Sequence, residues 1–405
     1  MAQETLIDIV PRLLAEIAND PAYRTGGSAA DTATGLPDDQ RMAALRANAG
    51  RLVMFFGVSF EQVRHAAALA RYTDLEPFLV YLKGDGIAGH YARAFRFGLA
   101  VDDNAALFRF IAEVRPLALT ITLPSEPLHY RALLPLFSQV YGIRTIPFVY
   151  DLCPPENILS SAWFRAERYI VENCDGFYSW HEPVPGVSGG LWTPMATMFN
   201  APIGLKRPRS IAYAGSLSPG MPEHNFLRFV ETYNDAGYSV DIFDAKGDCG
   251  YEPRSPMTRV HPRVPEFELI DRLAPIQFGF AAPYLAERPG DKTFHPGPGT
   301  EIDWCNRHGV PGKIVLYLEA GVIPIVHRET AYVAEFLERH NIGYVFDDDG
   351  YHDLERALAR KDPGEMLANI SELRETALSW KQPAGLLAEF FRNANERPRF
   401  PRRDR

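Results

Sequence analysis

Short apolar runs alternate with helical patterns along the first half of the chain. Each run is followed, after a few polar or glycine positions, by a segment whose apolar residues recur every three or four positions. Continuous apolar strands separated by helices are typical of a parallel sheet covered on both faces. The pattern predicts strands at 51–58, 77–82, 117–123, 145–151 and 176–180, and helices at 60–71, 104–114, 128–141 and 163–175.

The same alternation starts again near residue 210 and continues almost to the end of the chain. The helix pattern at 313–321 ends on Gly321, which is typical of a helix terminus. This second series predicts strands at 210–217, 238–244, 275–281, 322–326 and 342–346, and helices at 224–237, 266–274, 313–321, 331–341, 351–360, 364–378 and 383–394.

Two successive series of this kind predict an α/β protein with two Rossmann-like, doubly wound domains. A length of 405 residues also exceeds what one hydrophobic core usually serves. Residues 1–22 have the spacing of an amphipathic helix, and the Gly, Ser and Thr content of 26–39 indicates a linker. We therefore expect an N-terminal helix and linker over 1–45, Rossmann-like domains over 46–205 and 206–380, and a crossover helix with an Arg-rich tail over 381–405.

Composition narrows the class of protein. The net charge of −9 lacks the basic field of a nucleic-acid-binding protein, so we expect no nucleic-acid partner. The four cysteines are far apart and form no CxxC pair, which disfavours a disulfide framework or a structural zinc site. No secretory signal and no apolar run of membrane-spanning length is evident. We expect a cytoplasmic protein.

Ligands of open α/β sheets bind beyond the carboxyl ends of the strands, so the loops that follow strands are the candidates for binding and catalysis. The segment AYAGSLSPG (212–220) runs from a buried strand into Gly215 and Ser216 and then toward a helix. Glycine permits close backbone approach, and N–H groups at a helix start attract anions. The loop is either a diphosphate cradle or an ordinary strand–turn–helix connection.

A second loop, RHGVPGK (307–313), leads into the helix at 313–321. Lys313 stands in the first turn, where its charge and the positive end of the helix repel each other. A bound anion would compensate both charges, although a solvated surface lysine is the alternative. Arg307 and His308 lie in the same loop.

Several segments together resemble a known family. AYAGSLSPG resembles the first strand and phosphate loop of the C-terminal domain of GT-B glycosyltransferases. VPGKIVLYLEAGVIPIV (310–326) resembles the P-x-K-x-x-E-Y-L-A-A-G-x-P-V-V signature of the large retaining family 4. FLERHNIGYVFDD (336–348), RTIPFVYDL (144–152), AERYIVENCDGFYSWHEP (166–183) and MFNAP (198–202) match further family segments in order. The resemblance spans about residues 50–395 and implies two domains facing across a cleft that binds a nucleotide-sugar.

The chain departs from the family at the donor site. Leu316 stands where the family places a ribose-binding Glu, Glu319 lies three residues on, and Ser216 replaces an Arg in the phosphate loop, which also lacks its Lys. Glu319 could reach the ribose or sugar from one helical turn deeper. Taken with the resemblance, we expect donor contacts from Gly215, Ser216, Leu217, Arg263, Val264, Arg307, His308, Lys313, Leu316 and Tyr317.

The first domain would supply groups on the acceptor side. His90 could assist proton transfer from an acceptor hydroxyl, and Asp151 follows a predicted strand. A solvated histidine and a helix N-cap are the respective alternatives. His90, Asp151 and Glu319 are thus the catalytic candidates. The sequence offers no HExxH or paired carboxylates for a metal, so we expect metal-independent chemistry and no cofactor beyond a UDP- or GDP-sugar co-substrate.

The predicted function is transfer of a sugar from a nucleotide-sugar to a glycan, lipid or protein acceptor, with retention of configuration implied by the resemblance. A degenerate GT-B domain that binds a partner or a nucleotide without turnover is the alternative, favoured by Leu316 and the missing loop cations. A nicotinamide-dependent dehydrogenase is disfavoured because neither first strand is followed by GxGxxG. The Arg-rich tail is either a solvated end or a peripheral contact for anionic lipid.

Overall fold

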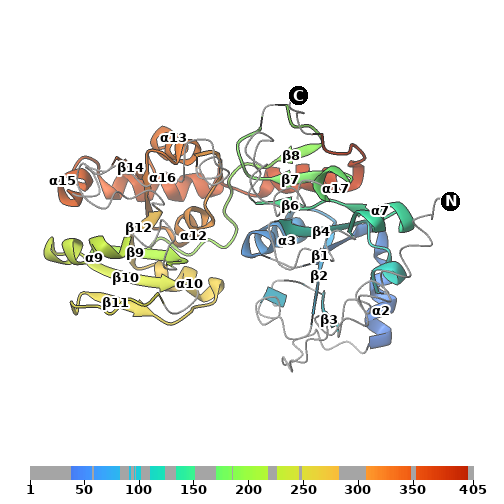
Figure 1. The fold of residues 1–405 in the computed structure, drawn as a ribbon, viewed down its shortest axis with the longest axis horizontal. Helices are drawn as coiled ribbons and strands as arrows, with labels where there is room; N and C mark the ends of the chain where they lie inside the picture. Colours follow the sequence, from blue (N-terminus) through green and yellow to red (C-terminus); the bar gives the residue numbers. More distant parts are fainter. Residues whose placement is uncertain are drawn as a thin grey trace, which may run out of the picture. The chain divides into compact units, whose positions relative to one another are not determined.

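The computed structural model shows two α/β units in one chain (Figure 1). Unit 1 comprises Met1–Thr193 and Trp380–Arg405, and unit 2 comprises Pro194–Ser379. The structure describes residues 38–56, 59–82, 91–92, 95, 97–101, 110–123, 134–150, 170–184, 186–217, 226–245, 249–281, 307–347 and 353–399. The predicted N-terminal helix at 1–22 lies outside these residues.

The sheet of unit 1 is parallel throughout, with strand order β3-β2-β1-β4-β6-β7-β8 and β5 paired with β4. All five residues of β1 are buried, as the unbroken apolar run LVMFF requires of a strand covered on both faces. The strands are β1 Leu52–Phe56, β2 Glu76–Leu82, β3 Phe97–Val101, β4 Ala118–Leu123, β5 Arg144–Thr145, β6 Phe148–Val149, β7 Phe177–Ser179 and β8 Gly190–Trp192.

The helices of unit 1 come from both ends of the chain. Ser59 caps α3 (Phe60–Tyr72) by accepting a hydrogen bond from the Gln62 backbone N–H. The last helix, α17 (Lys381–Asn393), packs against α3, so the chain returns to unit 1 after completing unit 2. Other helices that the structure describes in unit 1 include α2 (Asp38–Ala47), the 3-10 turn η2 (Ala49–Arg51) and α7 (Leu134–Tyr141).

Unit 2 contains a six-stranded parallel sheet of order β11-β10-β9-β12-β13-β14. Its strands are β9 Arg207–Gly215, β10 Ser239–Asp244, β11 Thr258–His261, β12 Ile276–Ala281, β13 Ile323–His327 and β14 Tyr344–Phe346. Its helices are α9 Phe226–Asp235, α10 Glu266–Leu273, α12 Gly312–Ala320, α13 Ala331–Arg339, α15 Leu354–Leu358 and α16 Pro363–Glu375. Because every strand runs in the same direction, all six carboxyl ends lie at one edge of the sheet.

The sequence pattern missed three short strands and one helix. β3, β8 and β11 each stand at the end of a sheet. β8 and β11 are short and consist mostly of partly exposed residues, so they give little apolar signal, whereas the apolar run FGLAV of β3 was not predicted as a strand. The helix α2 begins at Asp38 and overlaps the predicted linker, because its mean composition is polar rather than apolar. The structure places the change between units at Thr193–Pro194, upstream of the predicted 205–206 junction.

Candidate functional site

The carboxyl end of β9 brings together two residues that the sequence singled out. Gly215 has a φ of 149°, a conformation that side chains with a Cβ rarely adopt. A Cβ placed there would lie 3.4 Å from Cε and 3.5 Å from Nζ of Lys313. These are ordinary van der Waals distances, so the backbone conformation is what favours glycine here, and the Lys313 side chain packs close to the end of strand β9.

Lys313 is the second residue of α12 and is half-buried. Its ammonium Nζ donates to Tyr213 Oη at 3.0 Å and lies 4.8 Å from the centre of the Tyr213 ring. The N-cap residue, Pro311, provides no side-chain hydrogen bond to the helix start. The lysine charge and the positive end of α12 thus coincide at the carboxyl edge of the sheet, which favours an anionic ligand.

The hydroxyl of Tyr317 and the backbone N–H of Leu217 are both hydrogen-bonded within the protein. The Tyr317 hydroxyl accepts the Ala214 N–H at 2.9 Å and donates to the Phe280 carbonyl at 2.8 Å, so it joins β9 to β12. Burial raises the pKa of this phenol, with a smaller opposing effect from Lys313. The Leu217 N–H donates to Asp244 Oδ1 at 3.0 Å, which removes it from the N–H groups available to a phosphate.

The other predicted donor residues lie around this edge at varying exposure. Arg263 is exposed and Val264 half-buried, just after β11. Arg307 forms an ion pair of 2.8 Å with Glu329, in the loop after β13, and His308 is half-buried. In the part of the chain that the structure describes, no hydrogen bond or ion pair links Lys313 to Arg263, Arg307 or His308. Their contact with a donor stays a prediction.

Glu319 lies in the interior of unit 2, with none of its surface exposed. Its Oε1 accepts the backbone N–H groups of Met198 at 2.8 Å and Phe199 at 3.1 Å. These contacts tie the MFNAP segment to α12, which is a structural role. Leu316, on the same helix, is 7% exposed. A contact of either residue with ribose or sugar stays a prediction.

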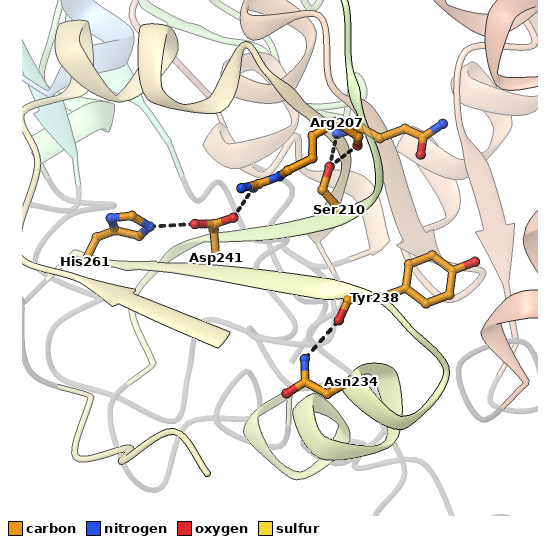
Figure 2. Close-up of polar contacts among 7 residues, drawn as sticks. Arg207, Ser210, Asn234, Tyr238, Asp241 and His261 are labelled. Atoms are coloured by element: carbon orange, nitrogen blue, oxygen red, sulfur yellow. Dashed lines mark hydrogen bonds and ion pairs between the residues drawn. The ribbon is translucent and has the colours of Figure 1, made fainter. Parts of the chain in front are cut away.

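A charged cluster that sequence reasoning missed spans the first strands of the same sheet (Figure 2). Asp241 on β10 is almost fully buried; one carboxylate oxygen contacts the Arg207 guanidinium and the other lies 2.7 Å from His261 Nε2. The His261 ring also stacks on Phe243, with ring centres 4.2 Å apart. An aspartate inside the apolar run YSVDIFD was the available signal, since a buried carboxylate requires partners.

In unit 1 the catalytic candidates His90 and Asp151 lie outside the described residues. His181, which follows β7, is buried, and its Nε2 contacts the Tyr150 carbonyl oxygen. Among the described residues of both units, no group of three or more His, Cys, Asp and Glu side chains could hold a metal ion. None of the helices described has the length and apolar character needed to cross a membrane.

Comparison with known proteins identifies the fold. No protein-family model and no curated protein sequence matches the chain. Among solved structures, Anabaena HepE in complex with UDP is similar at a TM-score of 0.53 and 10% identity, covering 84% of this chain and 98% of its own.

Two further structures are similar at a TM-score of 0.50. An alpha-glucosyltransferase in complex with UDP-glucose and DNA containing an abasic site has 13% identity and covers 85% of this chain and 96% of its own. A Listeria monocytogenes protein assigned as a UDP-N-acetylglucosamine 2-epimerase has 11% identity, with 87% and 99% covered. Identities this low show the fold alone. The chain therefore has the GT-B fold, with two Rossmann-like units built on parallel sheets.

Proposed function

We propose that the protein is a glycosyltransferase that transfers a sugar from a nucleotide-sugar donor to a glycan, lipid or protein acceptor. The observation that carries the proposal is the juxtaposition of Gly215, Lys313 and the start of α12 at the carboxyl edge of a parallel sheet. That edge is where open α/β sheets bind nucleotides. The similar structures solved with UDP and with UDP-glucose support this substrate class.

The proposed mechanism is electrostatic. As the bond between the sugar and the diphosphate breaks, negative charge develops on the leaving diphosphate. A fixed ammonium and the positive end of a helix stabilise that charge more than they stabilise the ground state. Lys313 and α12 supply both, so the reaction needs no metal ion in this proposal. Retention of configuration, implied by the sequence resemblance, is part of the proposal.

A thermal-shift screen against UDP, GDP, ADP, TDP and CMP and their sugar conjugates tests nucleotide binding. A ligand well above its dissociation constant stabilises the fold by a few kcal/mol and raises the melting temperature by several degrees. The nucleotide with the largest shift in melting temperature identifies the base of the donor. Release of that free nucleotide from its sugar conjugate reports turnover.

Lys313→Met tests the proposed chemistry. Removing one preorganised charged donor from a developing charge lowers turnover by about 100-fold or more. Lys361→Met is the matched control, because Lys361 also lies over a tyrosine ring of this sheet, 5.9 Å from the centre of Tyr344, and donates to the Gly343 carbonyl. Equal turnover in the Lys313 and Lys361 variants would exclude Lys313 from the reaction.

Two observations favour other uses of the same site. Leu316 and Ser216 lack the charges of the resembled family, which favours nucleotide binding without transfer. The likeness to the Listeria protein favours isomerisation of a nucleotide-sugar at the sugar C2. Incubation with UDP-N-acetylglucosamine, followed by chromatography, separates the three: free UDP indicates transfer or hydrolysis, a second UDP-sugar indicates epimerisation, and unchanged substrate with a thermal shift indicates binding alone.

The place of action and the acceptor are also proposals. Cys174 and Cys249 are buried free thiols, which suits the reducing cytoplasm. A lipid-linked acceptor would bring the enzyme to a membrane surface, where exposed arginines such as Arg397 and Arg399 would contact anionic headgroups. Co-sedimentation with vesicles containing phosphatidylserine, compared with phosphatidylcholine alone, measures that contact.

A further inference from the structure

We propose that Tyr213 is the positioning residue of the nucleotide site: it holds the Lys313 ammonium in place for the diphosphate of the ligand. This inference rests on the proposed function, because it concerns how the same site binds phosphate. Tyr213 lies in β9, two residues before Gly215, and none of its surface is exposed. It therefore reaches the ligand only through Lys313 and the loop.

The hydrogen bonds at Tyr213 run in one direction. An ammonium group can only donate, so the 3.0 Å contact places a Lys313 N–H on the phenol oxygen. The phenol in turn donates its own hydrogen to the Ser216 carbonyl at 3.3 Å. The lysine, the tyrosine and the loop backbone thus form a chain of donors in which the hydroxyl orientation is set by the loop.

The tyrosine ring is itself fixed. It stacks on Phe226 of α9, with ring centres 5.0 Å apart and 28° between the planes, and it lies beneath Gly215. The lysine ammonium also lies over the face of this ring, where the π electrons attract a cation. A lysine side chain loses much rotamer freedom when it is ordered, and here the protein orders it before any ligand binds.

The arrangement leaves the ammonium able to bind a ligand. Two of its three hydrogens have no hydrogen-bond acceptor among the residues that the structure describes. Tyr344, in the same sheet, shows that proximity of lysine and tyrosine does not by itself produce this pairing. There the hydroxyl donates to the Leu358 and Lys361 carbonyls, and the Lys361 ammonium donates to the Gly343 carbonyl.

The experiment compares Tyr213→Phe with Tyr344→Phe. Each variant removes one buried phenol oxygen from the same sheet and keeps the ring. Calorimetric titrations of the full chain with sodium pyrophosphate, UDP, GDP and ADP, and with the matching nucleosides, measure the phosphate-dependent part of the affinity. We expect Tyr213→Phe to weaken pyrophosphate and nucleoside diphosphate binding about 10-fold, as for loss of a hydrogen bond to a charged group. Nucleoside affinity should stay unchanged, and Tyr344→Phe should alter neither.

A double-mutant cycle separates positioning from a general packing effect. If Tyr213 acts through Lys313, adding Tyr213→Phe to Lys313→Met should cause no further loss of pyrophosphate affinity. A further loss of the same size in the Lys313→Met background would overturn the inference, as would an equal loss of nucleoside affinity in Tyr213→Phe.

The two proposals fail differently. If the wild-type chain binds a nucleoside diphosphate and Tyr213→Phe binds it equally well, the positioning role is wrong and the proposed function stands. If the wild-type chain binds none of UDP, GDP, ADP, TDP and CMP, the proposed function is wrong and the inference falls with it.

Discussion

Two groups of buried polar side chains, one in each unit, are satisfied in different ways. In unit 1, His65 is fully buried within a cluster of aromatic rings, and neither ring nitrogen has a hydrogen-bond partner among the residues that the structure describes; the same holds for the indole nitrogens of Trp180 and Trp380. In unit 2, Glu319, Arg374 and Asp241 are equally enclosed, but each contacts two or more groups from distant parts of the chain. Polar burial therefore costs stability around His65, whereas around Glu319, Arg374 and Asp241 it joins distant segments of the chain.

The surroundings of His65 explain how unit 1 tolerates the arrangement. The rings of Phe148, Tyr178, Trp180 and Trp380 lie 4.7 to 6.1 Å from the imidazole centre, each at a steep angle to it. Aromatic faces accept N–H groups weakly, so a neutral imidazole finds partial compensation there. A charged imidazolium would lose its hydration in this buried site, and burial therefore lowers the pKa of His65 to about 3, with a smaller contribution from Arg64.

The largest expected effect on stability is at Arg374, a buried side chain whose hydrogen bonds connect separate segments of unit 2. Its guanidinium donates to the carbonyl oxygens of Leu318 and Ala201 at 2.8 Å and to that of Glu319 at 2.7 Å. Arg374→Met would leave several buried acceptors unpaired, and we expect the free energy of unfolding to fall by about 3–5 kcal/mol. Denaturant titration measures this. Arg272→Met removes an exposed arginine and should lower the free energy of unfolding by less than about 0.5 kcal/mol. Equal losses in the two variants would show that the hydrogen bonds of Arg374 do not stabilise the fold.

Gly279→Ala tests how firmly the Tyr317 ring is held. A Cβ at residue 279 would lie 2.7 Å from three atoms of that ring, whose hydroxyl is bonded on both sides to β9 and β12. Because the ring cannot swing away without losing those bonds, we expect a loss of about 2–3 kcal/mol in thermal unfolding. Gly204→Ala, where no atom lies within 4 Å of the added Cβ, is the control. A tolerated Gly279→Ala would mean that Tyr317 is mobile.

Much of this fold could be predicted from the sequence because buried parallel strands carry a strong apolar signal. The run SIAYAGSL predicted β9, and KIVLYLEAG predicted α12 with its end at Gly321. The same patterns could not give the partners of a side chain. They placed Gly215 and Lys313 in separate loops, and only the parallel register of β9 and β12, with α12 packed on β12, shows that the two residues touch.

The missed residues share a physical reason. Tyr213 and Asp241 both lie inside strands. There the pattern of apolar residues predicts that a side chain is buried, but it does not predict which group hydrogen-bonds to its hydroxyl or carboxylate. Glu319 was expected near the ribose or sugar from the family resemblance together with helical spacing, and neither shows that the backbone at Met198 contacts its carboxylate. Contacts between residues 100 or more positions apart depend on packing, which no local pattern encodes.

The pH dependence of stability should reveal the unpaired histidine of unit 1. Unfolded His65 takes up a proton near its ordinary value of 6.5, whereas the folded form does so only near 3, so the unfolded state binds more protons between these values. Stability due to His65 is therefore complete above pH 6.5 and is lost as the pH falls toward 3. From pH 7.5 to 5.0 the loss should be about 2 kcal/mol.

His65→Phe isolates this contribution, because phenylalanine fills a similar volume and does not titrate. The difference in unfolding free energy between wild type and variant should narrow or reverse in favour of the variant as the pH falls. Tryptophan fluorescence is a suitable probe, since Trp380 and Trp180 lie 5.0 and 6.1 Å from the imidazole. Parallel pH profiles for the two proteins would show that His65 is protonated in the folded state.

The smallest expected effect concerns Asp241, where the charge can be removed while one acceptor oxygen is kept. Figure 2 shows the two contacts of the carboxylate; Asp241→Asn retains one oxygen, which can accept from Arg207, and places an NH2 group toward His261, with almost no change in shape or volume. Arg207 is 38% exposed on its side chain, so water takes over part of the lost interaction, and we expect a cost of only about 1 kcal/mol in denaturant titration. Asp241→Leu, which removes both acceptors, should cost more. If the asparagine and leucine variants lose the same stability, the carboxylate acts by its charge, and the hydrogen bonds that distinguish the surroundings of Asp241 from those of His65 contribute little.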